Sequence, residues 1–368
     1  MDEWNVDTAD TRQHSMGVVT GAGPREIGRN GPQAAEASTV QRFGRGSDRA
    51  RQWATDVATR DSSREARLTE LLDEVYEDLL SHDCRDPFTR LVDALADLVA
   101  GVDQDVVRQR WRPLCAEHPI NDIVQQDPFT RHSATKPRGY AGDADLIDLI
   151  YGVSAPGATT SSRGTEIFAQ MMARRGPASV RHRRALIAST IDAQAEASRQ
   201  PISVLSLACG HVREAVLSEA VSSGRATLTA FDQDRVSVDV ARAACVGYAV
   251  DVAVGSVRQA ITQTLTKDRF DLVYSAGLYD YLADSTASRL TARLFELVRP
   301  GGRLLVANFL PTNRERGYME TFMDWYLHYR SIEAFSLCSR EIPEGQIEHE
   351  RTFTDPDDQI VYLELTKR

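Results

Sequence analysis

Residues 201–234 decide the fold, and they read PISVLSLACGHVREAVLSEAVSSGRATLTAFDQD. The first apolar run, residues 202–208, is short and partly β-branched, which predicts a strand buried on both faces of a sheet. Apolar residues at helical spacing predict a helix over 214–222, and residues 227–231 predict the next strand. Strand, turn, helix and strand in this order are typical of half of a nucleotide-binding α/β sheet.

The turn after the first strand predicts what this sheet binds. Gly210 has no Cβ and allows the backbone to approach a ligand closely, and Asp232 follows the second strand, where a carboxylate can accept hydrogen bonds from ribose hydroxyls. Ala208, Val212 and Glu214 stand where a diphosphate-binding turn has glycines, and a negative charge at Glu214 would repel a diphosphate. These residues disfavour a dinucleotide such as NAD and favour a cationic adenosine ligand without phosphates, which points to S-adenosylmethionine.

Three motifs carry a resemblance to a known family. VLSLACG (204–210), FDLVYSAGLYDYL (270–282) and RPGGRLLVANF (299–309) resemble the class I S-adenosylmethionine-dependent methyltransferases. KPRGYAGD (136–143), AGLYDYL and YMETFMDWYLHYR are similar to the bacterial group of 3-hydroxypalmitic acid methyl ester biosynthesis methyltransferases. The resemblance covers roughly residues 120–368. It implies a Rossmann-like seven-stranded sheet whose last pair of strands is antiparallel.

The chain divides into three predicted segments. Residues 1–60 are rich in Gly, Ser, Thr, Arg and Gln and are expected to be mostly disordered. Residues 61–160 form a helical module with the RGYAGD loop, and residues 161–368 form the methyltransferase domain. The helical module is a candidate surface for a homodimer. Within the last segment, residues 250–254, 270–275 and 304–309 predict further strands, and residues 347–353 and 360–366 predict two weaker ones.

Composition narrows the partners and the compartment. The net charge of −10, from 43 basic and 53 acidic residues, gives no clustered basic surface, so no nucleic acid is expected. The five cysteines are scattered without a CxxC motif, which argues against a disulfide framework or a zinc site and favours a reducing cytoplasm. No apolar run is long enough to span a membrane. The expected partner is a small-molecule methyl acceptor, and no metal is expected.

The cofactor site is predicted at the carboxyl ends of the strands, where open α/β sheets bind ligands. The resemblance adds Ser256 and Val257, which would flank the adenine. The predicted cofactor-binding residues are Ala208, Cys209, Gly210, Asp232, Gln233, Ser256, Val257, Ser275, Ala276 and Gly277.

The acceptor site is predicted from the RGYAGD loop and from the residues after the fourth strand. Asp280 and Tyr140 are the candidate catalytic residues: Asp280 for holding or deprotonating a nitrogen, and Tyr140 for facing the sulfonium with its ring. The candidate substrate-binding residues are Arg138, Asp143, Tyr279, Asp284 and Glu320. Each has a structural alternative: Asp143 and Asp280 are also suited to capping helices. The basic run 181–184 either contacts a carboxylate or forms a solvated helix face.

Three functions remain open from the sequence. The acidic residues near the expected acceptor site favour N-methylation of an amino-acid-like or guanidino substrate in specialised metabolism. The resemblance favours a carboxyl O-methyltransferase that makes a hydroxy fatty acid methyl ester. The glycine-poor turn also leaves room for a catalytically inactive sensor of S-adenosylmethionine.

Overall fold

The computed structural model describes residues 62–81 and 85–368. The segment expected to be disordered, residues 1–60, lies outside the described residues. Residues 71–368 belong to one compact unit, so the helices that precede the sheet and the sheet itself are described together. The division between a helical module and a methyltransferase domain near residue 160 stays a prediction.

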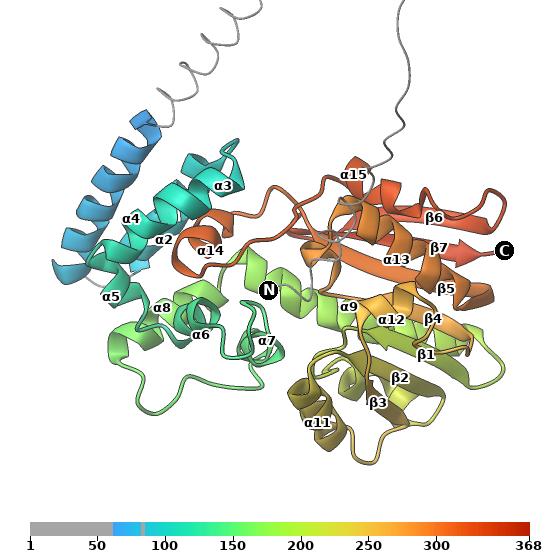
Figure 1. Ribbon diagram of the computed structural model, residues 1–368. Coiled ribbons are helices and arrows are strands. Elements are labelled where there is room, and N and C mark those ends of the chain that lie inside the picture. The colour runs from blue at the N-terminus through green and yellow to red at the C-terminus, as the bar shows by residue number, and fades with distance from the viewer. Residues whose placement is uncertain (1–61, 82–84) are drawn as a thin grey trace, which may run out of the picture. The chain divides into compact units, whose positions relative to one another are not determined.

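A seven-stranded sheet forms the centre of this unit (Figure 1). The strand order is β3-β2-β1-β4-β5-β7-β6. Strands β1 to β5 pair in parallel, and β7 runs antiparallel to both β5 and β6. The bounds are β1 Ile202–Leu207, β2 Ala226–Asp232, β3 Val250–Val254, β4 Phe270–Ser275, β5 Val298–Phe309, β6 Ile347–Thr354 and β7 Ile360–Lys367. This confirms the predicted Rossmann-like sheet, including the two weaker strands at the end of the chain.

Strand order reverses between β1 and β4, which pair directly with each other. The two strands run in parallel with Val204 opposite Leu272 and Ser206 opposite Tyr274. Side chains alternate between the faces of a strand, and Leu205 therefore joins the core under α12 (Val257–Ile261) and α13 (Asp284–Glu296), whereas Ser206 faces the other side. The reversal places a crevice at the carboxyl ends of β1 and β4.

The helices of the described chain differ from expectation mainly before the RGYAGD loop. Just before this loop, residues 120–124 and 128–135 form two helices, and Asp127 caps the second of them by accepting hydrogen bonds from the amides of Phe129 and Thr130. A helix covers residues 62–81. The others are α2 Arg85–Val99, α3 Gln104–Val106, α4 Arg112–Glu117, α5 Ile120–Val124, α6 Pro128–Thr135, α7 Ala144–Tyr151, α8 Ser162–Met172, α9 Arg175–Ala197, α10 Glu219–Ser222, α11 Arg235–Ala244, α12 Val257–Ile261, α13 Asp284–Glu296, α14 Arg316–Phe322 and α15 Ile332–Ser336.

Two predictions about the sheet region are wrong in detail. The helix expected over 214–222 is broken, because Ser218 adopts an extended conformation and caps the short helix α10 while its hydroxyl donates to Asp192. Strand β5 begins at Val298, well before the strand predicted over 304–309. Val298 already pairs with Phe270 of β4, and the register of the two strands shifts between Phe270 and Leu272.

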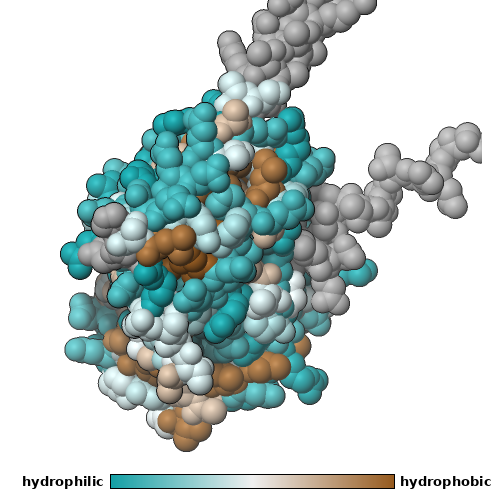
Figure 2. All heavy atoms as spheres, turned by 90° about the vertical axis from the view of Figure 1, so that its left-hand side faces the viewer, coloured by the Kyte–Doolittle hydropathy of each residue, from teal (hydrophilic) through white to brown (hydrophobic). Residues whose placement is uncertain are grey.

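Figure 2 shows the side of the molecule that faces left in Figure 1. Hydrophilic residues cover most of it, and the hydrophobic residues lie in several separate areas. This view gives no single surface for the expected homodimer, which stays a prediction. None of the described helices is both long enough and apolar enough to cross a lipid bilayer.

Candidate functional site

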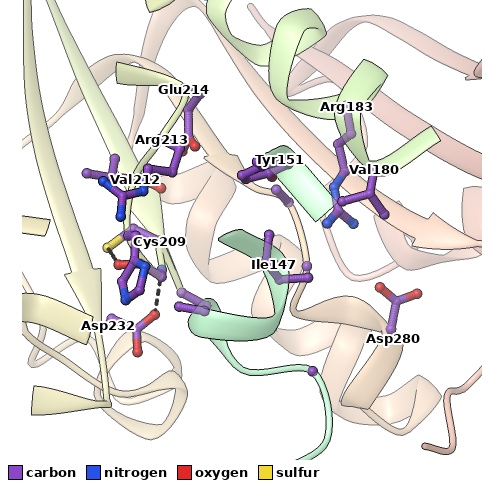
Figure 3. A pocket seen from close by; sticks show the side chains of 18 of the residues that line it. Ile147, Tyr151, Val180, Arg183, Cys209, Val212, Arg213, Glu214, Asp232 and Asp280 are labelled. Carbon is purple, nitrogen blue, oxygen red and sulfur yellow. Dashed lines mark hydrogen bonds between the residues drawn. The ribbon is translucent and has the colours of Figure 1, made fainter. Parts of the chain in front are cut away.

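A cavity opens at the carboxyl ends of β1 and β4, where the strand order reverses. Seven segments line it: the RGYAGD loop with α7, the helix α9, the end of β1 with the turn after it, the end of β2, the end of β4 with the segment after it, the end of β5, and residues 325–327. Figure 3 labels side chains from α7, α9, the turn after β1, the end of β2 and the segment after β4, and these side chains surround the cavity. Eight of the predicted site residues line it, namely Tyr140, Ala208, Cys209, Gly210, Asp232, Ala276, Gly277 and Asp280.

The turn after β1 has a left-handed backbone at every second residue. The φ angles are +55° at Ala208, +53° at Gly210 and +47° at Val212. Only glycine adopts this conformation without strain, and a β-branched residue there is an outlier. The chain therefore keeps the backbone path of a glycine-rich turn with glycine at one of the three positions, and such strain is typical of binding sites.

Asp232 joins this turn to the end of β2. Its Oδ2 accepts a hydrogen bond from the Gly210 amide at 2.8 Å, shown dashed in Figure 3, and its Oδ1 accepts from the Asp234 amide at 2.9 Å. Each carboxylate oxygen can accept a further hydrogen bond. Burial raises the pKa of Asp232 above its usual range. The carboxylate is thus fixed at the cavity wall with acceptor capacity left for a ligand hydroxyl.

The RGYAGD loop is tied to its surroundings by ion pairs. Arg138 donates through Nε to Asp145 at 2.8 Å and pairs through Nη1 with Asp234 at 2.5 Å. Asp234 lies two residues after Asp232, the acid predicted to bind the cofactor. Asp143 caps α7 by accepting from the Leu146 amide, as predicted for a cap. Neither Arg138 nor Asp143 lines the cavity, and both hold the loop that brings Tyr140 and Gly142 to it.

The loop also packs tightly on the far wall of the cavity. A Cβ at Gly142 would lie 2.6 Å from the Trp325 ring and still closer to the Tyr281 hydroxyl. Trp325 Nε1 donates to that hydroxyl at 2.9 Å. The aromatic stretch 318–330 therefore reaches the cavity, although the helix α14 ends at Phe322 and residues 324–330 form neither helix nor strand.

The segment after β4 supplies the buried acid of the site. Asp280 is 2% exposed, and one of its carboxylate oxygens accepts from the Phe309 amide at 2.6 Å. Burial raises the pKa of Asp280 to about 6. Its side chain forms no ion pair with any residue that the structure describes. A buried, unpaired carboxylate at a cavity is suited to proton transfer or to binding a cation.

The other predicted acceptor residues lie away from the cavity. Tyr279 is fully buried in the core and hydrogen-bonds to the Thr291 hydroxyl at 2.9 Å. Asp284 is exposed and pairs with Arg330, and Glu320 is buried between Arg316 and Gln104. None of these three side chains lines the cavity with Asp280, and their predicted role in binding the acceptor stays a prediction.

Four predicted cofactor residues also lie outside the lining. Ser275 is buried and donates to the Leu207 carbonyl, which ties β4 to β1. Ser256 caps α12 in a capping box with Gln259, and Val257 packs in the core. Gln233 is half-buried directly after Asp232. Their predicted contacts with the cofactor stay predictions.

Two buried side chains line the cavity that the sequence alone did not assign to it. Glu214 is 6% exposed and accepts from the Tyr274 hydroxyl at 2.6 Å, and burial raises its pKa. Arg183 is 5% exposed and also lines the cavity, although its run of basic residues favoured a solvated helix face. The signal was present in the spacing: Arg183 shares a helix face with Val180 and Ile187, both buried.

One group of side chains in the described residues has the geometry of a metal site: His132, Asp143 and Asp145. His132 Nε2 lies 2.8 Å from both carboxylate oxygens of Asp143, and Asp145 pairs with Arg138. Both carboxylates therefore have partners within the protein. The expectation of no metal stays a prediction.

Comparison with known proteins matches the segment that contains the turn after β1 and Asp232 to a methyltransferase domain. Residues 204–302 match a family model described as a methyltransferase domain. No curated protein matches the chain. A solved structure from Bordetella parapertussis, described as a possible exported protein, is 16% identical, with a TM-score of 0.54 over 75% of this chain and 96% of that chain. This likeness shows a shared fold.

Two further solved structures match with lower TM-scores. Magnesium protoporphyrin IX methyltransferase from Synechocystis, solved with S-adenosylmethionine, is 13% identical over 64% of this chain and 97% of that chain, with a TM-score of 0.42. The N-methyltransferase NodS from Bradyrhizobium japonicum is 12% identical over 50% of this chain and 86% of that chain, with a TM-score of 0.37. The matched domain confirms a methyltransferase segment at 204–302, for which S-adenosylmethionine is the cofactor.

Proposed function

We propose that this protein transfers a methyl group from S-adenosylmethionine to the amine nitrogen of an amino-acid-like small molecule. The observation that carries the proposal is Asp280, a buried carboxylate without an ion-pair partner among the described residues, in the same cavity as Gly210 and Asp232. A methyltransferase domain supplies the donor side, and Asp280 supplies a group that binds or deprotonates an amine.

The donor side of the cavity fits an adenosine ligand. The left-handed turn at Gly210 exposes backbone without a side chain in the way, and Asp232 keeps acceptor capacity for ribose hydroxyls. Ala276 and Gly277 bring a second stretch of backbone to the same cavity. Tyr140 lies near Asp232 and offers an aromatic ring to a cation. When bound, S-adenosylmethionine supplies an electrophilic methyl group on a sulfonium.

The acceptor side favours an amine over a guanidinium. A guanidinium is best held by paired carboxylates, and the predicted partners Asp284 and Glu320 do not line the cavity. A single carboxylate is enough to orient an amine. With a pKa of about 6, Asp280 is largely ionised at neutral pH and can take the proton that the nitrogen loses. Holding nitrogen and methyl carbon in line accounts for most of the remaining rate gain.

A second candidate, carboxyl O-methylation, is favoured by an apolar pocket beside the cavity. Three methionines and three aromatic side chains help to line this pocket, and Val180, Phe309 and Trp325 line both spaces. Such a lining suits an apolar substituent on the acceptor. A carboxylate acceptor needs no base, so Asp280 would then be dispensable for chemistry.

The experiment is a transfer assay with S-adenosylmethionine labelled in its methyl group. The acceptors are a panel of small amines, amino acids, and short- and long-chain hydroxy acids. Base-stable label on an amine supports N-methylation, and base-labile label on an acid supports the ester and refutes the nitrogen proposal. Binding of S-adenosylhomocysteine without transfer to the panel or to a cell extract would support the third hypothesis, an inactive sensor.

A further inference from the structure

Arg183 lacks the partners that a buried guanidinium usually has. Its Nε is buried and has no hydrogen-bond partner among the described residues. No described carboxylate lies within ion-pairing distance of Arg183. The Tyr151 hydroxyl accepts a hydrogen bond from the guanidinium, which leaves most of its five donors unused. Burying a charge without such partners is unfavourable, so a retained, unpaired guanidinium indicates a ligand.

Arg330, the other buried arginine of the described chain, shows what full pairing looks like. Its guanidinium contacts Asp284 at 2.9 Å, Asn308 at 2.6 Å, and the carbonyl oxygens of Tyr279 and Leu282. It lies in the core and lines neither cavity. The fold can therefore satisfy a buried arginine from its own atoms, and it does not do so for Arg183.

The open donors of Arg183 face the segment after β4. A Cβ at Gly277 would lie 3.5 Å from Nη2 of Arg183, which is an ordinary contact distance, so the guanidinium lies directly beside this segment. Figure 3 shows the guanidinium of Arg183 directed toward the part of the cavity where Asp280 lies. Asp280 is also unpaired, and the two side chains do not contact each other within 4.0 Å. The guanidinium of Arg183 and the carboxylate of Asp280 therefore line one cavity without forming an ion pair with each other.

We infer that Arg183 and Asp280 together bind an α-amino-acid group, with the carboxylate at Arg183 and the ammonium at Asp280. Arg183 matches the planar, two-oxygen geometry of a carboxylate, and Asp280 has an open oxygen for an N–H donor. This inference deepens the proposed function and rests on it. Two ligands carry this chemistry: an amino acid that serves as acceptor, which keeps the role proposed above for Asp280, and the methionine end of the methyl donor, in which case Asp280 binds the donor's ammonium instead of the acceptor amine.

The test compares two adenosine ligands by calorimetry on the full chain. S-adenosylhomocysteine carries the amino-acid group, and 5′-methylthioadenosine has the same adenosine and thioether without it. The variants are Arg183→Met and Arg183→Lys, and Arg175→Met removes an exposed charge from the same helix as a control. If the donor is the ligand, Arg183→Met weakens S-adenosylhomocysteine by about 10- to 100-fold and leaves methylthioadenosine unchanged. Unchanged methylthioadenosine binding also shows that the variant is folded.

If the acceptor is the ligand, Arg183→Met leaves both affinities unchanged. Protein amino acids are then added to the S-adenosylhomocysteine complex, and any that raise the melting temperature of the wild-type complex fail to do so for Arg183→Met. The inference is overturned if Arg183→Met binds S-adenosylhomocysteine normally and no amino acid distinguishes it from wild type. Failure of the wild-type protein to bind either adenosine ligand would instead overturn the proposed function.

Discussion

The Gly210 amide donates a hydrogen bond to Asp232 Oδ2 at 2.8 Å, and this contact joins the turn after β1 to the end of β2. The two residues are 22 positions apart in the chain. The contact holds the carboxylate at the cavity wall, where β1 and β2 pair in parallel and end side by side. The predicted donor site therefore combines the backbone of Gly210, after β1, with the side chain of Asp232, at the end of β2.

Asp232→Ala should lower the affinity for S-adenosylhomocysteine by at least about tenfold, because two hydrogen bonds from ribose hydroxyls to a charged acceptor are lost. Calorimetry measures this directly. Asp239→Ala removes an exposed acid on α11 and is the matched control. Equal affinities of Asp232→Ala and wild type would contradict the assignment of Asp232.

Asp280→Asn should abolish N-methylation while stabilising the protein at high pH. The folded-state pKa of about 6 lies above the usual aspartate value of 3.8, so the fold favours the protonated acid. Its stabilising effect is present below about pH 4 and is lost as the pH rises through 6. The amide removes this loss, so the free energy of unfolding should rise by about 1–3 kcal/mol at pH 8 and change little at pH 4.

Denaturant unfolding at both pH values measures this difference. Asp251→Asn, an exposed acid on β3, should show no such pH-dependent gain. In the wild-type enzyme, the rate of N-methylation should rise with pH through about 6 as Asp280 loses its proton. A flat rate profile between pH 5 and 8 would argue against a role as base.

Ala208→Gly should stabilise the protein by about 1 kcal/mol. Ala208 adopts a φ of +55°, which costs an L-residue about 1–2 kcal/mol and glycine nothing, and the greater flexibility of unfolded glycine offsets part of the gain. The midpoint of urea unfolding measures it. Ala230→Gly, buried in the middle of β2, should instead destabilise. Loss of stability in both variants would contradict strain at Ala208.

Gly142→Ala should weaken both cofactor binding and activity. A Cβ there collides with the side chains of Trp325 and Tyr281, which line the cavity, so the RGYAGD loop must move away from it. Gly157→Ala meets nothing within 4 Å and should behave as wild type. Affinity for S-adenosylhomocysteine and the rate of methyl transfer are the two measurements. A wild-type result for Gly142→Ala would show that the loop does not close this site.

The sheet was predictable because buried parallel strands leave a strong signal in the sequence. Residues 250–254 and 270–275 were predicted with the bounds that the structure has. The helix after the turn was not, because its apolar spacing fits a helix while Ser218 pairs with Asp192, 26 residues earlier in the chain. Such long-range contacts have no signature in local periodicity.

The donor side of the site was more predictable than the acceptor side. Gly210 and Asp232 follow from the strand ends, which parallel pairing brings together. Asp284 and Glu320 are acids like Asp280, but they do not line the cavity with it. Asp284 forms an ion pair with Arg330, and Glu320 forms one with Arg316. Arg183 was predicted only within an alternative for the basic run 181–184, because such a run usually faces water, and its position between buried residues of α9 is what places it at the cavity.

The most direct test of the account is a crystal structure of the protein with S-adenosylhomocysteine. The account predicts that the ribose hydroxyls contact the Asp232 carboxylate, that the adenosine lies along the turn at Gly210, and that the sulfur faces the part of the cavity lined by Asp280. Electron density for the ligand at any other place, with Asp232 and Gly210 free of contact, would contradict it.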